Sequence, residues 1–179
     1  AGESGWMNRM IERVQFKRLK KLCPHLNHDY LKFCASFTHT GTAGFIDDEG
    51  CYAILEMHSD GGARTRLFED LPTGTEILIK RVNENDPLAT YIDRAESIAH
   101  SASIDIDNRL GYGWKELLFY LFSWSVLQDP ERDVCSGRYV HWGQQHRFFI
   151  GERPHKWYPA RCVIDQRITH FITRIRIID

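Results

Sequence analysis

The sequence predicts an α+β fold, because helical and strand-like patterns occupy separate stretches of the chain. Helical periodicity dominates residues 6–35, strand-like runs fill residues 43–82, and helical segments return between residues 86 and 146. Segregation of this kind favours an α+β protein over a fold of alternating βαβ units. A chain of 179 residues, 42% of them hydrophobic, is long enough for one domain with a packed core.

An amphipathic helix is predicted over residues 6–22. Its apolar side chains recur every three to four positions, at Trp6, Met7, Met10, Ile11 and Val14. Five basic residues lie between positions 13 and 21, and we interpret them as a solvated helix face, with a membrane or nucleic-acid contact as the alternative. A second, shorter helix is expected over residues 29–35. Residues 1–35 are therefore predicted to form a basic helical extension of a domain over residues 36–179.

Four strand candidates follow. Residues 43–46 and 52–57 are apolar or β-prone and are separated by the turn-rich tetrad 47–50, a pattern that predicts a β-hairpin. Two further strands are expected over residues 64–68 and 76–82. The turn residues Pro72, Thr73 and Gly74 separate these two strands.

The second half of the chain returns to helical patterns. Asp86 and Pro87 supply an N-cap and a first-turn proline for a helix that should run to about residue 100. A nearly continuous apolar run predicts a buried helix over residues 114–126, and a third helix should follow Cys135 to about residue 146. Residues 168–178 are rich in Ile and Thr and predict a final strand.

The bulk composition argues against several classes of protein. A net charge of -1 with interspersed signs argues against a nucleic-acid partner, because such proteins usually carry a basic surface. No apolar run approaches the ~18 residues of a transmembrane helix. Five cysteines are an odd number that does not resemble a disulfide framework. Together with the lack of a visible signal peptide, this count favours a reducing, cytoplasmic compartment.

Cys135 is the cysteine whose setting is typical of a nucleophile. Thiol chemistry requires a thiolate, and the positive end of a helix stabilises that form of a cysteine. Cys135 follows a helix-breaking Asp-Pro segment and leads into the helix predicted up to residue 146. The small residues Ser136 and Gly137 leave room for a substrate beside the sulfur. None of the other four cysteines has this setting.

A nucleophilic thiol needs a base, and imidazole is the side chain suited to that role near neutral pH. His39 leads into the first strand of the predicted hairpin, and Glu56 lies on its partner strand. Neighbours on one face of an antiparallel pair lie about 5 Å apart, so a carboxylate there can orient an imidazole. The sequence therefore predicts Cys135, His39 and Glu56 as a triad. His58 lies two residues after Glu56 and is the alternative base.

Four short motifs extend this pattern along the chain. They are FTHTG around His39, AILEMH around Glu56, GYGW around Tyr112 and DVCSG around Cys135. In this order and at this spacing they resemble the permuted papain-like, NlpC-related and YiiX-like cysteine hydrolases, in which the histidine precedes the cysteine. The similarity spans roughly residues 36–163. Thr40 departs from the family pattern, in which an apolar residue is usual.

The resemblance implies a fold and an activity. The expected fold is a small antiparallel barrel-like sheet packed against helices that include the Cys-bearing helix. The expected activity is cleavage of an amide or ester bond in a peptide, a peptidoglycan peptide or an acylated substrate, through an acyl-thioester and without a cofactor. Tyr112 and Ser136 are candidates for contacting the substrate or its oxyanion. The alternative on the same fold is acyl transfer, as in the lecithin:retinol acyltransferase branch.

A different class of function is a binding module supported by zinc. Four zinc-type ligands lie within twelve residues, namely Cys23, His25, His28 and Cys34. Their spacing matches no well-known zinc finger, and they straddle a predicted helix start. A scaffold that keeps the fold but lacks catalysis is the remaining alternative.

Overall fold

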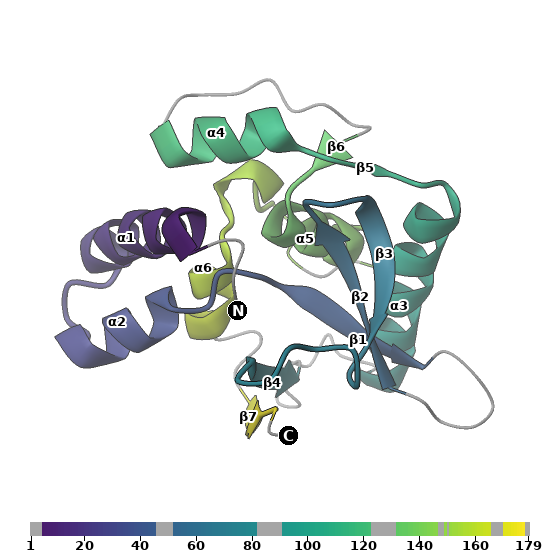
Figure 1. Ribbon diagram of the computed structural model, residues 1–179, viewed down its shortest axis with the longest axis horizontal. Coiled ribbons are helices and arrows are strands. Elements are labelled where there is room, and N and C mark those ends of the chain that lie inside the picture. The colour runs from purple at the N-terminus through teal and green to yellow at the C-terminus, as the bar shows by residue number, and fades with distance from the viewer. Residues whose placement is uncertain are drawn as a thin grey trace. The chain divides into compact units, whose positions relative to one another are not determined.

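The computed structural model shows a protein of mixed helices and antiparallel sheet, which confirms the α+β prediction (Figure 1). It describes residues 5–45, 52–81, 91–122, 132–146, 149, 151–165 and 170–177. The chain divides into two compact units that are discontinuous in sequence. Unit 1 comprises Ala1–His39, Leu71–Ala89 and Tyr158–Asp179, and unit 2 comprises Thr40–Asp70 and Thr90–Trp157.

Unit 1 contains the two predicted N-terminal helices, α1 (Gly5–Leu22) and α2 (His28–Ala35). The side chain of Asn27 caps α2 by accepting hydrogen bonds from the backbone amides of Asp29 and Tyr30, which fixes its start. The buried face of α1 differs from the predicted one. Trp6 is exposed, and the buried stripe consists of Ile11, Gln15 and Leu19.

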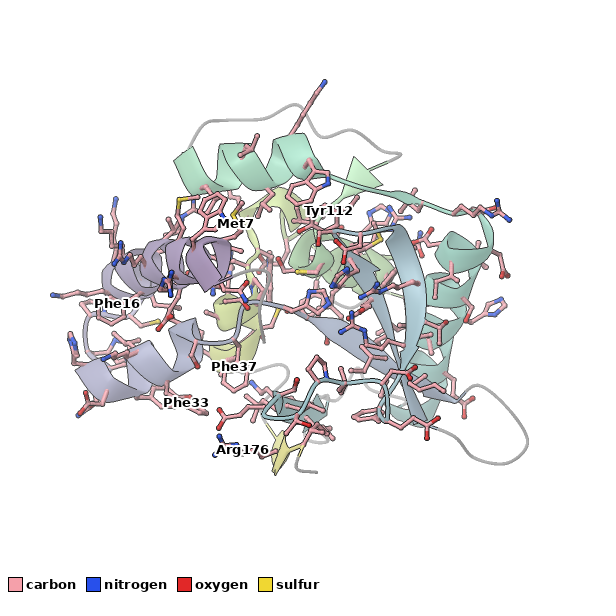
Figure 2. The ribbon with its side chains drawn as sticks, viewed as in Figure 1. Met7, Phe16, Phe33, Phe37, Tyr112 and Arg176 are labelled. Carbon is pink, nitrogen blue, oxygen red and sulfur yellow. The ribbon has the colours of Figure 1, made fainter. Side chains whose placement is uncertain are left out.

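Gln15 is the polar member of this stripe, and its fully buried amide joins three segments of unit 1. Its Nε2 donates to the carbonyls of Ala35 and Phe37, each at 3.0 Å, and its Oε1 accepts from the amide of Ala160 at 2.9 Å. Ala160 belongs to helix α6 (Pro159–Ile164), which the sequence did not predict. Phe33 packs edge-on against Phe37, with ring centroids 5.2 Å apart (Figure 2).

A two-stranded antiparallel sheet completes unit 1. Strand β4 (Glu76–Arg81) pairs with strand β7 (His170–Arg176), so both predicted strands are confirmed. Lys80 extends from β4 and donates to the backbone carbonyls of Cys162, Val163 and Asp165 at the C-terminal end of α6. Burial lowers the pKa of Lys80 below its usual value. The ammonium group thus satisfies carbonyls that the helix itself leaves unpaired.

Tyr158 precedes α6 and gives unit 1 a pH-dependent stability. Burial raises the pKa of Tyr158 to about 12, from an ordinary value of 10.0. The folded state therefore holds the phenolic proton more tightly than the unfolded chain. This contribution to stability is complete below pH 10 and is lost as the pH rises towards 12. Unfolding in denaturant at several alkaline pH values should show stability falling by up to about 1.4 kcal/mol per pH unit from this group. Tyr158→Phe should make the fall shallower, and equal slopes for the two proteins would contradict the assignment.

Unit 2 is built on an open, three-stranded antiparallel sheet. Its strands are β1 (Gly41–Phe45), β2 (Tyr52–His58) and β3 (Gly62–Leu67), in the order β1-β2-β3. The predicted hairpin of β1 and β2 is confirmed, although its turn at residues 47–50 lies outside the described residues. In its register Gly41 lies opposite Glu56.

Two helices cover one face of this sheet, as Figure 1 shows. Helix α3 (Tyr91–Asp107) contacts all three strands, and helix α5 (Cys135–Gln145) contacts β1 and β2. Between them lies a buried cluster of Leu55, Ile98, Ala102 and Trp142. The predicted end of α3 at about residue 100 was wrong, because the helix continues through the buried contacts of Ala102 and Asp105.

The remaining elements of unit 2 are shorter. Helix α4 (Trp114–Phe122) matches the described part of the predicted helix 114–126. Residues 123–126 lie outside the described residues. Strand β5 (Gly111–Tyr112) pairs in parallel with strand β6 (Arg132–Asp133). A single helical turn, η1 (Pro154–Lys156), follows later. In the described part of the chain, no helix is both long and apolar enough to cross a membrane.

Gly62 connects the three-stranded sheet to β5. It has a φ of 80°, and a Cβ built there would lie 1.9 Å from the carbonyl oxygen of Leu110. The next residue, Ala63, donates its amide to that same oxygen at 2.8 Å. Only glycine allows the backbone at position 62 to lie this close to the carbonyl group of Leu110.

Gly62→Ala should therefore destabilise the protein by about 1–3 kcal/mol in chemical denaturation. Gly74→Ala is the matched control, because Gly74 has a similar φ of 84° but open space around its Cα. Its cost should be limited to backbone strain and be clearly smaller. Equal effects of the two substitutions would show that the contact with Leu110 is unimportant.

Candidate functional site

Cys135 is the first residue of α5, as the sequence predicted, and it lies where two short parallel strands end. In the β5–β6 register, Tyr112 is opposite Asp133. Two residues after each of these, a helix begins, α4 at Trp114 and α5 at Cys135. The two helix N-termini therefore lie side by side. The N-terminus of each helix carries positive partial charge.

The surroundings of the Cys135 sulfur are mostly apolar. Cys135 is 6% exposed and forms a buried cluster with Met57 and Ala63 of the sheet. Ile106, Leu110 and Tyr112 pack against this cluster. Val134, the N-cap residue of α5, has no side-chain oxygen with which to cap the helix. The first amides of α5 are therefore not occupied by a capping side chain.

Tyr112, which the sequence analysis named as a candidate for contacting the substrate, lies near Cys135. It packs against the Cys135 cluster from strand β5, and its ring makes an edge contact with Trp114 at 5.3 Å (Figure 2). Trp114 is 47% exposed, although it is a large aromatic residue. The sequence analysis did not single out this residue. Its place at a predicted helix start directly after Gly113 was the available signal.

Ser136 follows Cys135 but has a structural contact. It is buried, and its hydroxyl donates to the backbone carbonyl of Trp157 at 3.1 Å. Trp157 in turn donates from Nε1 to Glu152 and packs against the ring of Phe149. This contact holds the start of α5 against the segment after η1.

Arg138, one helical turn after Cys135, anchors α5 to α3. Its Nε and Nη2 donate to the two carboxylate oxygens of Asp105, each at 2.6 Å. Trp142, a further turn along, donates to the same carboxylate from Nε1. All three residues are buried. Helix α5, which carries Cys135, is thus fixed by a bidentate ion pair.

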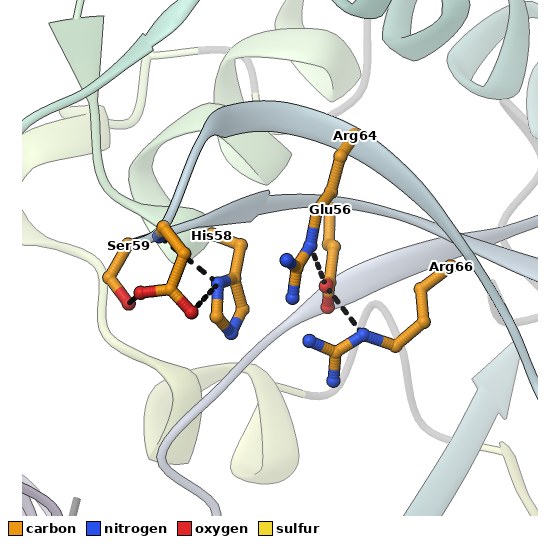
Figure 3. A network of polar contacts seen from close by, with 6 residues as sticks. Glu56, His58, Ser59, Arg64 and Arg66 are labelled. Carbon is orange, nitrogen blue, oxygen red and sulfur yellow. Dashed lines mark hydrogen bonds and ion pairs between the residues drawn. The ribbon is translucent and has the colours of Figure 1, made fainter. Parts of the chain in front are cut away.

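Glu56 lies on the other face of the sheet from Cys135. Side chains alternate along a strand, and Met57 packs in the cluster of Cys135. The Glu56 carboxylate is 2% exposed. It accepts a hydrogen bond from Nε of Arg64 at 2.9 Å and forms an ion pair with Arg66, whose Nε lies 3.3 Å away (Figure 3). The structure therefore does not bring Glu56 and Cys135 together on one face. The two arginines alternate along β3, a signal that the sequence analysis did not use.

The two candidate bases occupy different positions. His39 is exposed. It is the last residue of the first segment of unit 1 and lies two residues before β1. His58 ends β2, on the same face as Glu56 by alternation. Its Nδ1 accepts from the backbone amide of Asp60 at 3.2 Å and lies 3.4 Å from Oδ2 of that residue (Figure 3).

The four candidate zinc ligands do not converge. His28 packs edge-on against Phe16, and Cys34 is buried in α2. Burial raises the pKa of the Cys34 thiol. In the parts of the chain that the structure describes, no three His, Cys, Asp or Glu side chains are grouped as a metal site. The geometry therefore does not favour the zinc-supported module.

Comparison of the chain with protein-family models, with curated proteins and with solved structures found no match. The chemistry of the site then follows from its own geometry. A thiol at two adjoining helix N-termini is suited to attack a carbonyl carbon, because the same amides can stabilise the resulting oxyanion. The apolar lining and the exposed ring of Trp114 suit a substrate with an apolar group next to that carbonyl.

Proposed function

We propose that the protein is a thiol-dependent amidase, peptidase or esterase of the permuted papain-like kind, with Cys135 as its nucleophile. The observation that supports this most strongly is the position of Cys135 at the start of α5, beside the N-terminus of α4. The packing of α5 on the sheet of β1 and β2 supports the same fold. The order of the four sequence motifs is the second, independent support.

The proposed reaction proceeds through an acyl-thioester. His39 accepts the thiol proton of Cys135, and the thiolate attacks the carbonyl carbon of the substrate. The backbone amide of Cys135 donates to the oxyanion, and loss of one such donor typically costs about 10²–10³ in rate. The oxyanion collapses, the amine or alcohol leaves with the proton from His39, and a water molecule then hydrolyses the thioester. Another acceptor in place of water would make the protein an acyltransferase.

The roles of the base and the carboxylate stay predictions from the sequence. Glu56 is proposed to orient His39, yet its carboxylate also binds Arg64 and Arg66. His58 is the alternative base. The pH profiles of labelling in His39→Gln and His58→Gln separate the two, since only loss of the true base should move the profile of Cys135.

The substrate class follows from the lining and from the resemblance. Tyr112 packs against the cluster of Cys135, and the ring of Trp114 contacts that of Tyr112. This aromatic surface suits an apolar side chain or an acyl chain. The resemblance suggests peptides, including those of peptidoglycan, as the first substrates to test. Lipid acyl esters are the second.

Competitive alkylation tests the proposal directly. A limiting amount of iodoacetamide at neutral pH, followed by peptide mass spectrometry, should label Cys135 first. Cys23 is the internal control, because it is more exposed than the buried Cys135. If accessibility alone decided the order, Cys23 would react before Cys135. That result would mean that Cys135 is not activated, and the protein would then be better described as a non-catalytic scaffold.

A further inference from the structure

Two arginines of β3 share one carboxylate in an unusual way. Arg64 and Arg66 project from the same face of the strand, and the Nε of each contacts the same atom, Oε1 of Glu56, Arg64 by a hydrogen bond and Arg66 by an ion pair (Figure 3). Guanidinium groups usually bind carboxylates through two parallel hydrogen bonds, one to each oxygen. Here each arginine uses a single nitrogen for Glu56. Their Nη groups remain for other partners.

One of these remaining nitrogens is buried without a partner. Nη2 of Arg64 has no hydrogen-bond acceptor among the described residues and is shielded from solvent. A guanidinium group cannot lose its proton to escape this situation. A buried donor left unpaired is costly, and native proteins rarely retain one without a reason such as a bound group.

Within the described contacts of this network, the charges also do not balance. Arg64 and Arg66 carry two positive charges, and Glu56 carries one negative charge, which leaves a net charge of +1. The carboxylate of Asp60 is 75% exposed, and the nearby residues His58 and Ser59 are its partners. A single additional negative charge would balance the arginine pair.

We propose that Arg64 and Arg66 bind a singly charged carboxylate group of a ligand, with Nη2 of Arg64 as a principal donor. A planar carboxylate matches the donor geometry of guanidinium, and one charge matches the local excess. The terminal or side-chain carboxylate of a peptide is the ligand class that this chemistry recognises. The site lies on the face of the sheet opposite Cys135, so the proposal does not depend on hydrolase activity.

Titration with sodium acetate, followed by NMR at constant ionic strength with sodium chloride, tests the proposal. Saturable shifts are expected in the Nε–H resonances of Arg64 and Arg66 and in the backbone amides of β3. Arg64→Gln should raise the Kd for acetate by about tenfold or more, because a charge-assisted hydrogen bond is lost. The Kd of this variant is measured from the shifts of the backbone amides. Arg64→Lys keeps the charge but not the planar donor pair, and it should weaken binding too.

Arg153→Gln serves as the matched control, because Arg153 is an exposed arginine of the same unit. Acetate should bind this variant as it binds the unmodified protein. If Arg64→Gln does not fold, Arg66→Gln provides the same test with the same expected loss. Unsaturable shifts, or equal acetate binding by the arginine variants and the control, would overturn the proposal. Tighter binding of inorganic phosphate than of acetate would overturn the assignment to a single carboxylate.

Discussion

Cys135→Ala should abolish turnover of any substrate that the protein hydrolyses, with a loss of at least about 10⁴-fold in kcat. Only a thiol can form the acyl-thioester, and the neighbouring Ser136 carries a hydroxyl that donates to the carbonyl of Trp157. The measurement is a rate assay on amide and ester substrates with an apolar acyl group. Mass spectrometry of the quenched reaction should also show the acyl adduct only in the protein that retains Cys135.

Cys162→Ala is the control for this experiment. Cys162 is a buried cysteine of α6 in unit 1, and its loss tests whether removal of any buried thiol is enough to reduce the rate. The control variant should retain the activity of the unmodified protein. Full activity in Cys135→Ala would exclude the proposed mechanism, whatever the substrate.

Elements with strong local signals could be predicted from the sequence. Helix α1 has apolar residues at helical spacing, and the β1–β2 hairpin has two β-prone runs around a turn-rich tetrad. The helix start at Cys135 was predicted because a breaker precedes it. In each case the signal lies within the element itself, so no knowledge of its partners was needed.

Elements that depend on distant partners could not be predicted. Strands β5 and β6 have two residues each, too few for a periodic pattern, and they exist because they pair with each other. The last two turns of α3 have no strong helical signal either. In these turns, Ala102 packs against Trp142 of α5 and Asp105 binds Arg138 of α5.

The candidate site divides in the same way. The position of Cys135 at a helix start could be predicted from the sequence. Tyr112, which the sequence analysis named as a candidate for contacting the substrate, packs against the cluster that contains Cys135. The partners of Glu56 could not be predicted, because they depend on the register of β2 with β3, which places Arg64 opposite Glu56. A change of register by one residue would turn the arginines to the other face.

Asp105→Ala is expected to have the largest effect on stability. It removes the carboxylate that binds Arg138 through two hydrogen bonds and also accepts from Trp142. Arg138 is buried and would keep its charge without a partner, since a guanidinium stays protonated. Breaking such a pair from one side typically costs about 3–5 kcal/mol. For a chain of this size, thermal unfolding should occur roughly 10 °C lower.

Two further variants distinguish loss of the ion pair from simple damage to α3. Asp107→Ala changes an exposed carboxylate two residues along the same helix, and it should alter the free energy of unfolding by less than about 0.5 kcal/mol. Asp105→Leu combined with Arg138→Met removes both charges, so it should cost less than Asp105→Ala alone. If the double variant is instead as unstable as the sum of its single variants, the two side chains are not coupled. The anchoring of α5 to α3 would then depend on the apolar contacts of Trp142 rather than on the buried ion pair.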